Sequence, residues 1–111
     1  MYAQLVYFDG PRSTDQLVAA DFATQHRIEP ALAAVPGLLG TYELRRHDGS
    51  GVIVVFAESE DVLLDAQRAI LATELLPGED MALLPGPDRV ETYPVIAYRG
   101  SADIYADRSR R

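Results

Sequence analysis

Residues 38–57, LLGTYELRRHDGSGVIVVFA, predict two antiparallel strands joined by a short connection. Residues 38–47 have the composition of a strand, and residues 47–51 (HDGSG) that of a hairpin loop. Every side chain of the next run, 52–57, is apolar, which is typical of a central strand covered on both faces. The sequence therefore predicts a sheet whose middle strand needs cover from two sides.

Two helices are expected outside this hairpin. The first spans about residues 15–34 and should kink or break at Pro30, because proline has no N–H to donate inside a helix. The second begins at Ser59 or Glu60 and runs to about Leu76. The linker that follows contains two Leu-Leu-Pro-Gly copies and has room for one helical turn.

Two further strands complete the order β-α-β-β-α-β: residues 2–8 (YAQLVYF) and 89–98 (RVETYPVIAY). Pro94 places the last strand at a sheet edge. This order predicts an α+β, ferredoxin-like fold, in which both helices lie on one face of a four-stranded antiparallel sheet. A second copy covering the bare face would make a dimeric α+β barrel. Residues 1–99 are expected to form one domain and residues 100–111 a polar tail.

The composition excludes several kinds of chemistry. Cysteine is absent, so disulfides, thiol nucleophiles and zinc–thiolate sites are excluded, and the absence of lysine removes side-chain Schiff bases. A net charge of −7 argues against a nucleic-acid partner. Neither a signal-peptide pattern nor an apolar run of membrane-spanning length is present, so we expect a cytoplasmic protein without a membrane partner.

One face of the first helix mixes apolar and polar side chains. At about 100° per residue, Phe22 falls on this face, and Asp21, Gln25 and Glu29 run down its middle. If the face meets the sheet, these side chains line a cavity, and a desolvated carboxylate there would have a raised pKa suited to a general base. The alternatives are a rotated helix or carboxylates paired with arginines, for which the candidates are Arg45, Arg46 and Arg99.

His26 lies at the flank of the same face. A histidine there could carry a proton to or from a bound molecule, so the candidate catalytic residues are His26, Asp21 and Glu29. The alternative is a boundary histidine hydrogen-bonded to Glu29 or to water. His47 is expected to be exposed in the hairpin loop, and two histidines this far apart form no metal motif, so we expect no metal site.

Tyrosines are the other candidates for ligand contact. Tyr7, Tyr42 and Tyr98 lie on predicted strands, where each would offer a flat apolar ring and one hydroxyl. Together with Gln25 and Phe22 they form the predicted substrate-binding set, the alternative being ordinary core or dimer packing. Strand alternation places Tyr42 on the face of its strand that is expected to meet the helices.

Two stretches carry a family resemblance: VPGLLGTYELRR at residues 35–46 and VVFAESED at residues 54–61. The chain resembles the antibiotic-biosynthesis-monooxygenase-like family, in which a Pro-Gly step opens the second strand and an acidic run begins the second helix. The resemblance covers residues 2–98 and implies a homodimeric α+β barrel with a pocket for a small hydrophobic molecule. Members include haem degraders and cofactor-independent oxygenases that act on polycyclic phenols.

The chain departs from this family pattern at two places. Ala57 stands where members often carry an aromatic residue, and Ala66 and Gln67 where many carry a histidine, which disfavours haem degradation. The resemblance then implies a monooxygenase for aromatic or polyketide-like substrates that needs no cofactor. Two other functions stay open: a proton-transfer cyclase or isomerase, and a non-catalytic dimer that binds a metabolite or stabilises a partner enzyme.

Overall fold

The computed structural model describes residues 1–100, so the predicted tail lies, apart from Gly100, outside the described residues. Strands and helices follow one another in the predicted order. The elements are β1 (Tyr2–Phe8), α1 (Thr14–Ala23), the π-helical segment η1 (Thr24–Ile28), α2 (Glu29–Ala33), β2 (Leu38–Arg45), β3 (Gly51–Ala57), α3 (Glu60–Leu71), the 3-10 turn η2 (Met81–Leu83) and β4 (Arg89–Pro94).

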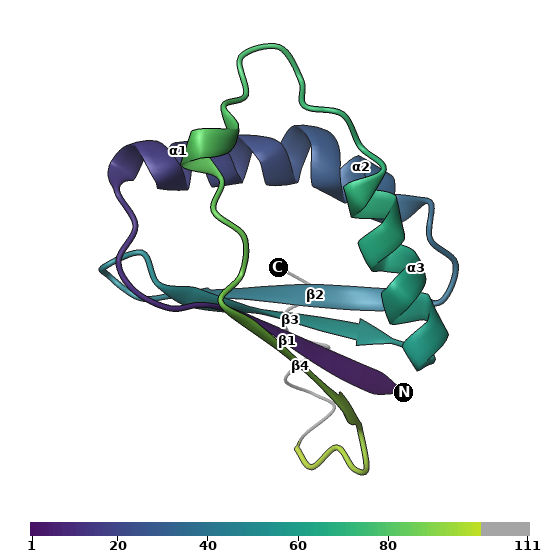
Figure 1. Ribbon diagram of the computed structural model, residues 1–111. Helices are drawn as coiled ribbons and strands as arrows, with labels where there is room; N and C mark the ends of the chain where they lie inside the picture. The colour runs from purple at the N-terminus through teal and green to yellow at the C-terminus, as the bar shows by residue number, and fades with distance from the viewer. Residues whose placement is uncertain (101–111) are drawn as a thin grey trace, which may run out of the picture.

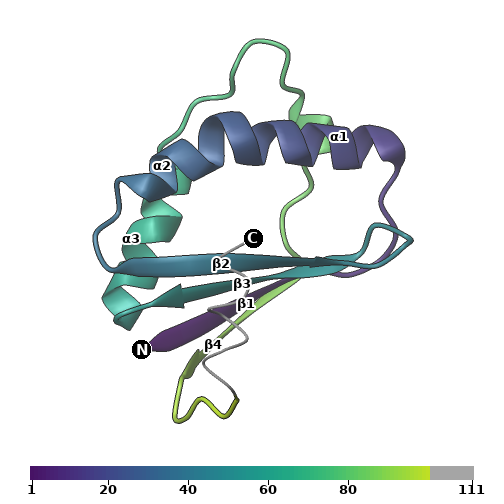
Figure 2. The same ribbon diagram turned by 180° about the vertical axis from the view of Figure 1, so that it is seen from behind.

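The four strands form one antiparallel sheet in the order β2-β3-β1-β4, with the helices on one face (Figures 1 and 2). The predicted ferredoxin-like α+β fold is therefore confirmed. β4 is an edge strand, as Pro94 indicated, but it ends at Pro94 rather than at residue 98. It pairs with β1, and just beyond Pro94 the Val95 N–H donates a hydrogen bond to the Met1 carbonyl (2.9 Å). No helix within residues 1–100 is long and apolar enough to cross a membrane.

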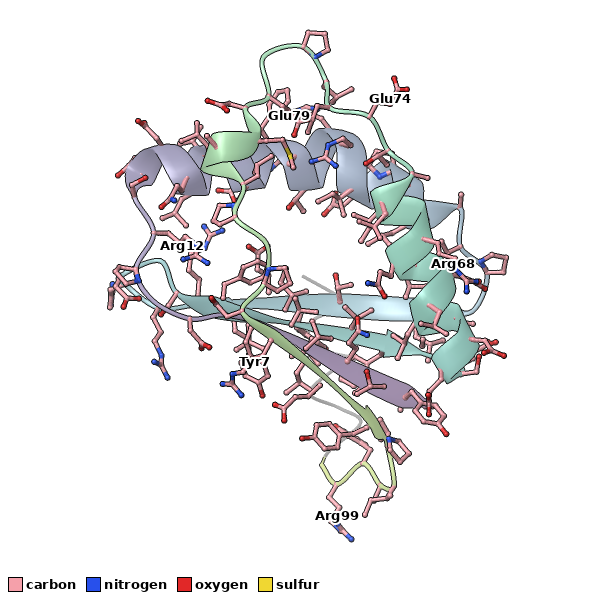
Figure 3. The ribbon with its side chains drawn as sticks, viewed as in Figure 1. Tyr7, Arg12, Arg68, Glu74, Glu79 and Arg99 are labelled. Atoms are coloured by element: carbon pink, nitrogen blue, oxygen red, sulfur yellow. The ribbon has the colours of Figure 1, made fainter. Side chains whose placement is uncertain are left out.

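The strand register decides which side chains meet the helices. Tyr42 lies opposite Val54 in the β2–β3 pair and so shares a face with Tyr7, which lies on the side of the sheet away from α1 (Figure 3). Arg45 is on the other face and donates a hydrogen bond to Asp21 of α1. The prediction that the Tyr42 face meets the helices is wrong. The helices cover the other face of the sheet, where Arg45 of β2 contacts Asp21 of α1.

The first helix is interrupted just before Pro30. In η1 the backbone makes wider turns, with the Glu29 N–H bonded to the Thr24 carbonyl, and α2 then continues with Pro30 in its first turn. A proline ring crowds the carbonyl four residues earlier, here that of His26, and cannot donate to it. The wide turns accommodate this missing bond, so the chain stays helical through Pro30, and a π-helical segment at residues 24–28 stands in place of the predicted kink or break.

α3 ends at Leu71, about one turn before the predicted end at Leu76. The Thr73 hydroxyl donates to the Ile70 carbonyl (2.6 Å) and accepts a hydrogen bond from Arg27 Nη1 (2.8 Å). These bonds turn the chain away from the helix axis and toward η1. Residues 73–84, which we call the crossing segment, then pass beside α1 on their way to β4 (Figure 1).

Arg27 and Glu79 hold the crossing segment in place. Arg27 Nε donates to Glu79 Oε2 (2.8 Å) and Nη2 to Oε1 (3.2 Å), so the pair is bidentate. The Arg27 side chain is 12% exposed and that of Glu79 only 2%. Glu79 also accepts a hydrogen bond from the Leu76 N–H (2.7 Å). The bonds from Arg27 and from Leu76 lower the pKa of Glu79, so the carboxylate stays charged near neutral pH.

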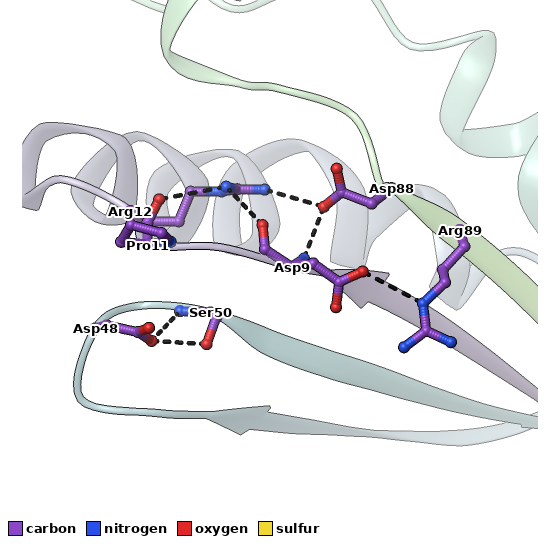
Figure 4. Close-up of polar contacts among 7 residues, drawn as sticks. All are labelled: Asp9, Pro11, Arg12, Asp48, Ser50, Asp88 and Arg89. Carbon is purple, nitrogen blue, oxygen red and sulfur yellow. Dashed lines mark hydrogen bonds and ion pairs between the residues drawn. The ribbon is translucent and has the colours of Figure 1, made fainter.

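Charged side chains also join the end of β1 to the start of β4 (Figure 4). Asp88 accepts a hydrogen bond from the Asp9 N–H (2.6 Å), and Arg89 donates to the Asp9 carboxylate (3.2 Å).

The nearby hairpin loop needs glycine at position 49, where φ is +88° and a Cβ would lie 2.8 Å from the Cβ of Arg12. The sequence HDGSG therefore fits a loop that packs tightly against the start of the helical layer.

Replacement of Glu79 by Gln tests the Arg27–Glu79 pair. Glu79→Gln leaves the buried Arg27 charge uncompensated, so we expect the midpoint of thermal unfolding to fall by several degrees. Glu74→Gln is the matched control, because Glu74 is exposed at the start of the same segment (Figure 3). Equal effects of the two substitutions would show that the pair does not hold the segment.

The same pair should make stability depend on pH. The pKa of Glu79 is lowered from its ordinary value of 4.5, so its contribution is present above that value and is lost as the pH falls through the lower folded pKa. Below about pH 4.5 the free energy of unfolding of the wild type should fall more steeply than that of Glu79→Gln. Denaturant titrations from pH 7 to pH 3 measure this, and parallel curves would contradict it.

Candidate functional site

A hollow of about 340 Å³ lies between α1 and the crossing segment. Its α1 wall is built at positions i, i+3, i+4 and i+7, which share one helix face. Most of the lining is apolar, with carboxylates among it. The residues are Asp15, Val18, Ala19 and Phe22 from α1, and Pro77, Gly78, Glu79, Asp80, Leu83 and Leu84 from the crossing segment.

Local capping fixes both walls. The Ser13 side chain accepts a hydrogen bond from the Gln16 N–H, and the Gln16 side chain accepts one from the Ser13 N–H, so α1 starts at a defined residue. The Asp80 carboxylate accepts from the Ala82 N–H (2.9 Å) and starts η2. Between these walls Phe22 remains 40% exposed, which leaves apolar surface open to a ligand.

His26 extends the aromatic wall. Its ring lies against the ring of Phe22, with centroids 4.6 Å apart and planes tilted by 44°. His26 belongs to η1, so the π-helical segment carries a titratable ring directly beside a residue that lines the hollow. A predicted catalytic residue and a predicted substrate-binding residue are thus in contact.

Asp21 is held in an ion pair instead of being desolvated. Arg45 Nη2 donates to Asp21 Oδ1 (2.9 Å) and to Glu43 Oε1 (2.9 Å), and the Asp21 side chain is 52% exposed. The hydrogen bond with Asp21 is the main reason that the pKa of Arg45 is raised. The arginine pairing given above as the alternative is therefore what the structure shows for Asp21.

Gln25 and Glu29 continue the Asp21 stripe but are not buried. Both are exposed, and neither side chain has a hydrogen-bond partner within residues 1–100. The covered residues are Ala23 and Arg27 on the opposite side of the helix. Ala23 is 1% exposed, and Arg27 is paired with Glu79. The expectation of a buried polar stripe is wrong, because the covered side of the helix is the one that carries Ala23 and Arg27.

The three predicted tyrosines do not join the hollow. Tyr42 packs edge-on against Phe56 on the bare face of the sheet (6.1 Å), and the Arg89 guanidinium lies 3.7 Å above the Tyr7 ring on the same face. Burial, followed by a hydrogen bond with Glu91, raises the pKa of Tyr7, so its phenol is not a base near neutral pH. Tyr98 follows β4 and is 57% exposed. The sheet therefore separates Tyr7 and Tyr42 from His26.

The crossing segment is the part of the site that sequence reasoning missed. Its Pro77-Gly78 step indicated only where the second helix should stop. Nothing in the sequence links Glu79 to Arg27, because the two residues are far apart along the chain. As for metals, no group of three His, Asp or Glu side chains in the described part of the chain is placed to hold an ion.

Comparison with known proteins supports the fold assignment. No family model matches this chain. A MhuD variant, solved with two manganese protoporphyrin IX molecules per active site, has a TM-score of 0.66 at 16% identity, covering 91% of this chain and 100% of the other. The haem-free haem-degrading protein Rv3592 of Mycobacterium tuberculosis gives 0.54 at 17% identity, covering 89% and 98%.

The monooxygenase from the ActVA-Orf6 gene of Streptomyces coelicolor, solved with nanaomycin D, gives a TM-score of 0.52 at 24% identity, covering 90% of each chain. The chain has the fold of these three proteins.

The exposed Asp21–Arg45 pair should contribute little to stability. Because both side chains reach solvent, we expect Asp21→Asn to change the free energy of unfolding by less than about 1 kcal/mol. Urea denaturation of the two proteins measures this difference. A loss well above that value would show that this pair, and not packing alone, holds α1 over β2.

Proposed function

We propose that this protein binds a planar, apolar small molecule in the hollow beside α1 and oxidises it as a cofactor-independent monooxygenase of the antibiotic-biosynthesis-monooxygenase-like family, in the cytoplasm. The contact between Phe22 and His26 carries this proposal, because it places a proton acceptor against an aromatic wall that is open to a ligand. The shared fold with a monooxygenase solved with nanaomycin D supports an aromatic, polyketide-like substrate.

In this proposal the substrate supplies its own electrons. His26 accepts a proton from a phenol or from an acidic C–H bond, and the resulting anion passes one electron to O₂. The substrate radical and superoxide then combine to form a C–O bond, and protonated His26 returns its proton to the peroxide anion. Loss of water from the resulting hydroperoxide leaves a carbonyl. For an anthrone, the ring CH₂ and O₂ become C=O and H₂O, so no bound cofactor is needed.

Two other residues predicted as bases have weaker support. Asp21 is already engaged by Arg45, and Glu29 lies exposed further along the helix. The pairing of Asp21 favours the second candidate function, a non-catalytic protein that binds a metabolite in the same hollow. A proton-transfer cyclase or isomerase would use His26 in the same way but consume no oxygen.

Oxygen uptake separates these functions. With anthrone- and hydroquinone-type phenols, the wild type should consume oxygen well above the autoxidation blank. His26→Gln should lower the rate by about a hundredfold, the scale of a lost general base, whereas Asp21→Asn and Glu29→Gln should stay within about twofold.

Full activity of His26→Gln would show that the proposed base is wrong. Absence of uptake by the wild type across the set of phenols would contradict the monooxygenase. Binding without uptake would then favour the two other functions.

We propose that a second copy of the chain covers the bare face of the sheet. This face carries large side chains that are half exposed: Tyr42 at 41%, Leu44 at 55% and Tyr93 at 50%. The apolar residues that are buried within residues 1–100 are few and mostly small: Ala23, Ala57, Leu63 and Ala66. A self-complementary apolar face of this kind favours a homodimer, in which Tyr7 and Tyr42 would be interface residues.

A charge placed on this face should break the dimer. Leu44→Glu would bury a carboxylate in the interface, so we expect light scattering at micromolar concentration to give a monomer mass. Leu64→Glu is the matched control, because Leu64 is a leucine of similar exposure (47%) on α3. A monomeric wild type, or a Leu44→Glu variant that stays dimeric, would contradict the proposed interface.

A further inference from the structure

The charges around the hollow all have one sign. Asp15 comes from α1 and Asp80 from the crossing segment, so the two opposite walls each contribute an exposed carboxylate. Neither carboxylate has an ion-pair partner within residues 1–100. The third acidic residue, Glu79, is neutralised by Arg27.

No cation balances these two carboxylates. None of the residues lining the hollow, all within residues 1–100, is an arginine or a histidine. The arginines on neighbouring elements are engaged elsewhere, since Arg27 holds Glu79 and Arg12 lies 3.9 Å from Asp88. The chain as a whole carries −7, so no distant excess of positive charge offsets them.

The apolar and acidic parts lie at different places along the helix. Phe22 is seven residues beyond Asp15, which is about 10 Å along an α-helix. Because Asp15, Asp80 and Phe22 line the same hollow, a charged substituent on a ring against Phe22 lies in the electric field of both carboxylates. At separations of this kind, each carboxylate should change the affinity for a charged group by about threefold or more, attracting a cation and repelling an anion.

We infer that the hollow selects its ligand by charge: it binds a planar aromatic molecule that bears an amine more tightly than the uncharged analogue, and it rejects the carboxylate. Asp15 and Asp80 are the specificity-determining residues. This inference rests on the proposed function, which requires that the hollow bind an aromatic molecule. It also sets this chain apart from binders of porphyrins with carboxylate side chains.

Three ligands of nearly equal shape test this selectivity. The full chain is titrated with 1-naphthylmethylamine, 1-naphthalenemethanol and 1-naphthoic acid at pH 8 and low ionic strength, and calorimetry gives each Kd. Histidine side chains are ordinarily uncharged at this pH. We expect the amine to bind about tenfold more tightly than the alcohol and the acid about tenfold more weakly, with both differences shrinking at high salt.

Substitutions locate the source of the selectivity. Asp15→Asn with Asp80→Asn should bring the three Kd values within about twofold of one another, and asparagine retains the capping role of Asp80. The matched control, Asp61→Asn with Glu74→Gln, changes the net charge equally at exposed acids that do not line the hollow. A circular dichroism melt confirms that each variant is folded.

Each outcome has a distinct meaning. Equal binding of the three ligands by the wild type would overturn the charge selectivity and leave the proposed binding function intact. Loss of selectivity in the control as well would also overturn the inference, because the net charge of the protein would then be the cause. Failure of all three ligands to bind would overturn both the inference and the proposed function.

Discussion

The buried ion pair between Arg27 and Glu79 is the interaction on which the helical layer depends. It joins η1 to the crossing segment, and both side chains are almost fully removed from solvent. A buried pair of this kind contributes little net free energy compared with apolar packing, but it tolerates only one geometry. Its main effect is therefore to fix where the crossing segment lies, and this segment forms one wall of the hollow.

The two sides of α1 then have different roles. Ala23 is almost fully buried, whereas Phe22 faces the hollow and stays accessible. His26 lies in η1, and its ring extends the Phe22 wall. The wide turns of η1 accommodate the hydrogen bond that Pro30 cannot donate. The missing hydrogen bond of Pro30 and the Arg27–Glu79 pair thus both act on η1. This segment carries His26, where we propose that the chemistry occurs.

Local patterns predicted most of the fold, because alternation, capping and turn residues act over a few positions. The apolar run 52–57 indicated the central strand β3, and Pro94 indicated the edge strand. The end of α3 and the path of the crossing segment were missed, since both depend on Arg27, which is distant in sequence. The wrong face for Tyr42 has a similar cause: alternation separates two faces, but only the Asp21–Arg45 contact shows which one meets the helices.

The central claim is that the hollow between α1 and the crossing segment is the ligand site. Amide chemical shifts of the ¹⁵N-labelled full chain, titrated with 1-naphthalenemethanol, test it most directly. We expect saturable shifts concentrated in residues 15–26 and 77–84, with the strand residues 52–56 largely unchanged. Shifts confined to the sheet, with α1 and the crossing segment unaffected, would contradict it.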